Sequence, residues 1–62
     1  MIPPDRLEEE LQTLWRTATP DSIGPAMVQA RRSVEAAPAP VRTRVAEVME
    51  SLEQLERWLR DR

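Results

Sequence analysis

The sequence predicts an all-α protein, a three-helix up-down-up bundle formed by one small domain over residues 1-62. Two observations indicate this class. Apolar residues recur at alternating intervals of four and three, the spacing of one helix face. Proline-containing segments interrupt this spacing twice, at 19-25 and 37-40, and such short connections favour antiparallel neighbours. We expect the three helices to span about residues 5-18, 22-37 and 40-61.

The first helix is predicted to begin near Asp5. Pro3 and Pro4 precede it, and proline is tolerated in the first turn of a helix. Asp5 and Glu8 have the spacing of a capping box, which predicts that Asp5 is the N-cap. One apolar stripe then follows, with Trp15 beside it, and consists of Leu7, Leu11, Leu14 and Ala18.

The start of the second helix has two alternatives. In the first, Gly24 caps the helix and Pro25 is its first residue. In the second, Thr19 or Asp21 is the cap, and Pro25 is accommodated within the first turns. Either start gives the same apolar stripe, in which the alanines allow a neighbouring helix to approach closely. This stripe consists of Ile23, Met27, Ala30, Val34 and Ala37.

The third helix is the longest and is predicted to begin at Pro40. Met49 flanks its apolar stripe and widens the apolar face, so that the helix can contact two neighbours. Glu53 with Arg57, and Glu56 with Arg60, have the i,i+4 spacing of favourable ion pairs. The stripe has the spacing of a coiled-coil face and consists of Val41, Val45, Val48, Leu52, Leu55 and Leu59.

The length of the third helix predicts association with another chain. A domain of 62 residues buries only about 60% of the surface of its unfolded chain, so its own core is marginal. Because the other helices are shorter, we expect one end of the third helix to lack cover, unless the first helix folds over it in a monomer. The residues predicted to bind a second copy or another protein are Val45, Val48, Leu52, Leu55, Trp58, Leu59 and Trp15.

The two tryptophans are the only aromatic residues. In an up-down-up bundle, the first and third helices are parallel, which predicts that Trp15 and Trp58 lie at the same end, beside Ile23 and Met27. We expect an aromatic cluster there. A place in the core or at its edge is favoured over a role as an exposed anchor for a partner, although tryptophan is enriched among such anchors.

Composition argues against an enzyme. The chain has no cysteine and no histidine, which excludes thiolate chemistry and removes the commonest general base and metal ligand. Four glutamates recur every three residues in the third helix, namely Glu47, Glu50, Glu53 and Glu56. We interpret them as a solvated face rather than a metal site. We predict no catalytic, cofactor or metal residue. The chain has no long apolar run and no signal-peptide pattern, which predicts a soluble cytoplasmic protein.

Arginine supplies all nine basic residues, and four arginines flank the second connection. They provide an alternative function, because arginine binds phosphate with two parallel hydrogen bonds. The chain would then be a small nucleic-acid-binding regulator, of the antitoxin or phage-repressor type. The net charge of -2 favours instead an arginine face paired with glutamates. The four arginines that would bind nucleic acid in this alternative are Arg31, Arg32, Arg42 and Arg44.

These observations together favour a non-enzymatic protein-protein interaction module. Three wide apolar stripes on a short chain predict packing against helices of a second copy or of another protein. The classes that fit are an adaptor, a docking domain, a small chaperone or a subunit of a complex, of bacterial or phage origin, with no cofactor and no membrane partner.

Overall fold

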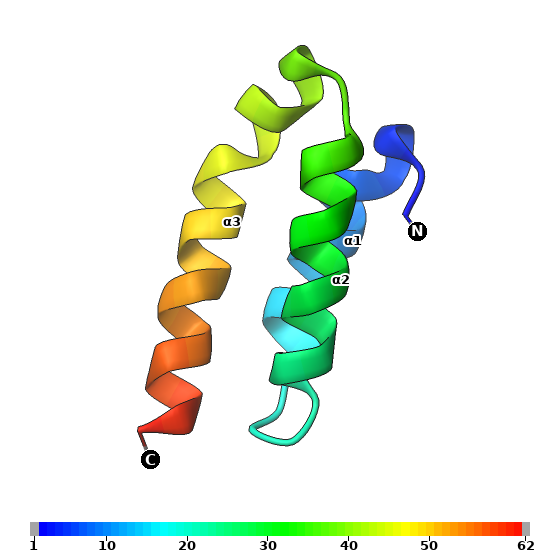
Figure 1. Ribbon diagram of the computed structural model, residues 1–62. Helices are drawn as coiled ribbons and strands as arrows, with labels where there is room; N and C mark the ends of the chain where they lie inside the picture. Colours follow the sequence, from blue (N-terminus) through cyan, green and yellow to red (C-terminus); the bar gives the residue numbers. More distant parts are fainter. Residues whose placement is uncertain (1, 62) are drawn as a thin grey trace.

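A computed structural model of the chain describes residues 2-61 and consists of three α-helices preceded by one short turn of 3-10 helix. The predicted all-α class is confirmed. Figure 1 shows the chain running down along α1, back up along α2 and down again along α3. The Cα trace extends over 34 × 19 × 17 Å. The elements are η1 (Pro4–Arg6), α1 (Leu7–Thr17), α2 (Ile23–Ala36) and α3 (Ala39–Arg60).

The chain enters α1 through the 3-10 turn rather than through a capping box. Pro3 is the extended residue before the turn, with φ −61° and ψ 144°, and its carbonyl accepts the amide of Arg6 at 3.0 Å. Asp5 lies inside the turn and makes no capping hydrogen bond. The predicted capping box is therefore wrong: Pro3 and Arg6 take the N-cap positions of η1 and α1, and neither makes a side-chain capping hydrogen bond.

Thr19 and Ser22 form the turn that leads into α2. The amide of Thr19 donates to Ser22 Oγ at 2.9 Å, and the amide of Ser22 donates to Thr19 Oγ1 at 3.1 Å. The carbonyl of Thr19 also accepts the amide of Ile23 at 2.9 Å. Thr19 and Ser22 thus hold the turn before α2 in the reciprocal pattern of a capping box. The helix itself begins at Ile23 with Ser22 at its N-cap position, rather than any of the three predicted caps.

Gly24, the other candidate for this cap, lies inside α2. It precedes Pro25, whose ring crowds the Cβ of a helical residue before it. Glycine has no Cβ at this position, and Pro25 lies in the first turn of α2, where its missing amide costs no hydrogen bond within the helix.

The two prolines between α2 and α3 end one helix and open the next, as predicted. Ala37 is extended, with φ −78° and ψ 153°, as expected for a residue before proline. The carbonyl of Pro38 accepts the amides of Val41 and Arg42 at 3.0 Å each, which starts α3. Consequently α3 begins at Ala39, one residue before the predicted start.

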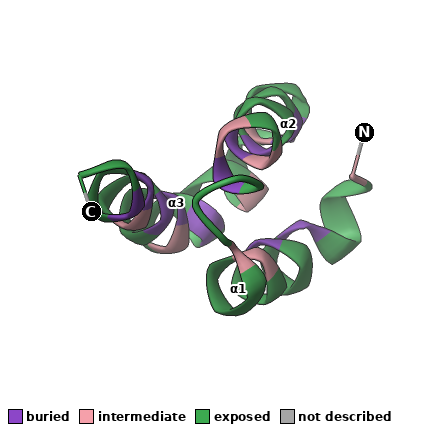
Figure 2. Ribbon diagram, turned by 90° about the horizontal axis from the view of Figure 1, so that it is seen from below, coloured by how far each residue is buried: buried purple, intermediate pink, exposed green. Residues whose placement is uncertain are grey.

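The core lies among the three helices, and α3 packs against both of the others (Figure 2). Each helix contributes one buried stripe, and the core includes Ala30 of α2 and Ala37 directly after this helix. The buried apolar residues are Leu7, Leu11, Ile23, Met27, Ala30, Ala37, Val45, Met49, Leu52 and Leu59.

The buried face of α3 is rotated relative to the predicted stripe. Met49 is buried, while Val48 and Leu55 lie at the edge of the core and are partly exposed. Leu59 is only 7% exposed, so the expectation that this end lacks cover within the chain is wrong for that residue. The physical reason is that α2 begins at the level of the last turn of α3: a Cβ on Gly24 would be 3.4 Å from Nη2 of Arg60.

Candidate interaction groove

A continuous groove runs between α1 and α3 on the surface of the protein. It consists of two shallow, adjoining hollows that share Trp15 and Ser51. We call it the α1/α3 groove. The first hollow is lined by Gln12, Trp15, Arg16, Glu47, Val48 and Ser51. The second hollow is lined by Trp15, Ser51, Gln54, Leu55 and Trp58.

The tryptophans are the largest apolar side chains of this groove. Trp15 is 49% exposed and Trp58 is 57% exposed, and both line the second hollow. They therefore lie at the same end of the molecule, as predicted. Ile23 and Met27, in contrast, are fully buried, so the tryptophans are surface residues and do not extend the core beside them.

The residues predicted to bind a partner fall into two groups. Val45, Leu52 and Leu59 are buried within the core of the single chain and are not available to a partner in the folded state. The remaining residues are partly exposed and lie together in the groove, with three of them on the side of α3 next to α1 and Trp15 on α1 itself. These are Trp15, Val48, Leu55 and Trp58.

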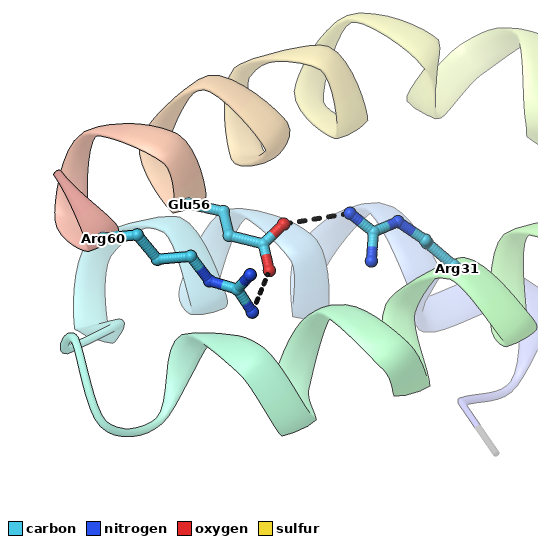
Figure 3. Close-up of polar contacts among 3 residues, drawn as sticks. All are labelled: Arg31, Glu56 and Arg60. Carbon is cyan, nitrogen blue, oxygen red and sulfur yellow. Dashed lines mark hydrogen bonds and ion pairs between the residues drawn. The ribbon is translucent and has the colours of Figure 1, made fainter.

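Glu56 forms the centre of an ionic cluster between α2 and α3 (Figure 3). Its side chain is only 11% exposed, and its Oε1 accepts a hydrogen bond from Arg31 Nη2 at 2.9 Å. Its Oε2 lies 3.1 Å from Nη2 of Arg60, so the predicted pair of Glu56 with Arg60 is confirmed. The ion pairs within residues 2-61 are these two, and the pair predicted between Glu53 and Arg57 is not among them.

The prediction that Glu56 lies on a solvated face is wrong. The other three glutamates of that series are exposed, but Glu56 follows Met49 by one heptad and lies on the buried side of α3. The signal was present in the sequence as the spacing from Met49 through Leu52 and Glu56 to Leu59. A stripe defined by apolar residues alone does not include Glu56, so its buried position was not predicted.

The predicted arginine patch is divided. Arg31 is engaged by Glu56, whereas Arg42 and Arg44 are exposed in the first turns of α3. Glu56 follows Arg44 by twelve residues, which corresponds to about 18 Å along the helix axis. Arg32 is exposed on α2, beside Arg31 in the sequence. The guanidinium of Arg31 thus belongs to the cluster between α2 and α3.

Ser33 is a buried polar residue that the sequence analysis did not single out. It is 3% exposed, and its Oγ accepts the backbone amide of Ile2 at 3.3 Å. This hydrogen bond joins the segment before η1 to α2. A small residue three positions from Ala30 and four from Ala37 continues the buried stripe of α2, and its position on that stripe was the available signal.

Within residues 2-61, no group of three or more acidic, histidine or cysteine side chains is arranged to hold a metal ion. None of the helices in this part of the chain is long and apolar enough to cross a membrane. Comparison of the chain with protein-family models, with curated proteins and with solved structures gave no significant match.

Proposed function

We propose that this chain is a non-enzymatic, cytoplasmic protein-protein interaction module whose α1/α3 groove binds an amphipathic helix. The observation that carries this proposal is the exposure of Trp15 and Trp58 in one groove. Single exposed apolar residues are ordinary on protein surfaces, but two half-exposed indoles on one apolar surface are typical of a binding site.

The composition of the groove supports a helical ligand. Its apolar part is formed by the two tryptophans with Val48 and Leu55, and tryptophan is enriched among the residues that dominate interface energies. The sides carry polar groups that can fix the register of a bound helix. Two adjacent helices with an apolar groove between them form the usual receptor for the apolar face of a third. The polar residues are Gln12, Arg16, Glu47, Ser51 and Gln54.

In this proposal, a helix from outside the chain completes the up-down-up bundle by covering the groove. An adaptor, a docking domain, a small chaperone or a complex subunit would all use the groove in this way. The nucleic-acid alternative has no comparable support, because Arg31, one of its four arginines, is already paired with Glu56.

Site-specific photo-cross-linking tests the proposal. A benzophenone amino acid replaces Gln54, which lines the groove, in the full chain expressed in its native cell. The matched control carries the same group in place of Gln29, an exposed glutamine of α2 that does not line the groove. Irradiation followed by mass analysis identifies what each position contacts.

We expect a protein adduct from position 54 and none from position 29. Equal adducts from both positions, or no adduct from position 54, would contradict the proposal, because neither result assigns a binding role to the groove.

A further inference from the structure

We propose that the helix bound in the α1/α3 groove carries an acidic residue on one side of its apolar stripe and a basic residue on the other, both near the same end. This inference rests on the proposed function and names the charge pattern of the ligand. The distribution of charged and uncharged residues between the two hollows of the groove carries it.

Opposite charges line the two sides of the first hollow. Arg16 belongs to α1 and Glu47 belongs to α3, and both residues are exposed. Neither of them takes part in the ion pairs formed within residues 2-61. The α1 side of this hollow thus presents a positive charge to a helix in the groove, and the α3 side presents a negative charge.

A ligand helix can complement both charges at once. Side chains project all around a helix, so residues next to its apolar stripe face the two sides of the groove. An acidic residue on the side next to α1 meets Arg16, and a basic residue on the side next to α3 meets Glu47. Two residues of the same sign would place one like charge against another, which is costly across an interface. The first hollow therefore selects helices of mixed charge.

The second hollow determines where the charged pair lies along the ligand. Its lining has the uncharged polar residues Ser51 and Gln54, and is otherwise formed by Trp15, Leu55 and Trp58. A charged side chain of the ligand over this hollow would lose water without gaining an ionic partner. An apolar side chain there covers the indoles instead. The ligand is therefore apolar at the tryptophan end of the groove and carries its charged pair at the other end.

Four synthetic helical peptides test this pattern. They share one stripe of leucines and differ only at two positions near one end, one on each side of the stripe. These positions carry glutamate and arginine, arginine and glutamate, two glutamates, or two arginines. The two mixed peptides cover both directions in which a helix can lie in the groove. The anisotropy of a dye on each peptide measures its binding to the full chain.

Reversal of charge in the protein gives the sharpest form of this test. Arg16→Glu makes both sides of the first hollow acidic, and Glu47→Arg makes both sides basic. The matched controls are Arg44→Glu and Glu50→Arg, which change the net charge equally at exposed positions of α3 outside both hollows. Circular dichroism checks that each variant keeps its helices.

We expect the unmodified chain to bind one mixed peptide about tenfold more tightly than either peptide with two like charges. In Arg16→Glu the peptide with two arginines should become the tightest ligand, and in Glu47→Arg the peptide with two glutamates should do so. The controls should keep the preference of the unmodified chain. Preferences that stay the same in both groove variants, or that change equally in the controls, would overturn the inference.

Failure of all four peptides to bind would also overturn the inference. If the solution mass of the chain then rises with concentration from 7.2 kDa towards twice that value, a second copy is the occupant instead. The proposed function fails separately from the charge pattern. A photo-adduct from position 54 to a protein leaves that function standing even if the peptides do not bind, whereas the absence of any adduct there contradicts the function itself.

Discussion

Arg31 and Glu56 are 25 residues apart in the sequence, and their side chains join α2 to α3 through a hydrogen-bonded ion pair of 2.9 Å. The side chain of Glu56 is largely buried, whereas the side chains of Arg31 and Arg60 remain 44% and 64% exposed at the surface. This exposure limits the strength of each pair, because water screens charged groups at a surface. The carboxylate itself depends on these partners, since a buried charge without one is costly.

Replacing the carboxylate should therefore weaken the fold moderately. We expect Glu56→Gln to lower the free energy of unfolding by about 1 kcal/mol, because the amide keeps the size of the side chain but loses both ion pairs. Urea denaturation followed by circular dichroism measures this change. Glu50→Gln is the control, since Glu50 is exposed and unpaired within residues 2-61. Equal effects of the two substitutions would show that the cluster does not stabilise the fold.

The turn before α2 gives a second stability prediction. Thr19→Ala removes the hydroxyl that accepts the amide of Ser22 in the turn before α2, and we expect a loss of about 1 kcal/mol in the free energy of unfolding, the usual size for the loss of such a hydrogen bond. Thr43→Ala is the control: Thr43 is an exposed residue within α3, where alanine is the better helix former. If Thr43→Ala lowered the free energy of unfolding by as much, the hydrogen bond of the Thr19 hydroxyl would not be the cause of the loss.

The exposure of the two indoles can be measured directly. Trp15→Phe and Trp58→Phe each leave one tryptophan, and acrylamide should quench the fluorescence of either variant readily in the folded state at high dilution, because each indole is about half exposed. If a bound helix covers the groove, as proposed, quenching should become weaker when the protein is in complex with its partner. Strong protection at high dilution would place the indoles in the core instead.

The groove predicts a specific effect on association. Leu55→Arg places a charge among apolar groove residues, and we expect it to abolish association while the helicity of the chain is kept. The control is Val28→Arg, because Val28 is an exposed apolar residue of α2 outside the groove. Light scattering at matched concentrations compares the two. An unchanged mass of an associating chain after Leu55→Arg would remove the groove from the interface.

The helices themselves could be predicted from the sequence to within one or two residues at most ends. Apolar spacing identified the buried faces of α1 and α2, and Pro38 and Pro40 marked the break before α3 because proline restricts the backbone at and before its own position. Met49 was correctly added to the face of α3. These features depend on local spacing, which is why they could be found without a structure.

The features that were missed depend on residues far apart in the chain. The spacing of Glu56 from Met49 places it on the buried side of α3, but its partner Arg31 comes from another helix, and no pattern within α3 reveals that partner. Leu59 is covered because α2 starts beside the last turn of α3, which depends on how the helices are placed. For the same reason, spacing alone could not separate Leu52, which belongs to the core, from Leu55, which belongs to the groove.

The central position of α3 also affects how the protein is synthesised. A ribosome releases α1 and α2 first, and the apolar stripes of these two helices have little to bury against until α3 follows, because α3 packs against both. Leu11 and Met27 thus stay open to water, chaperones and proteases in the nascent chain. Translation has to deliver the turn bearing Leu59 before the core can close, so α1 and α2 cannot complete their packing while α3 is still being made.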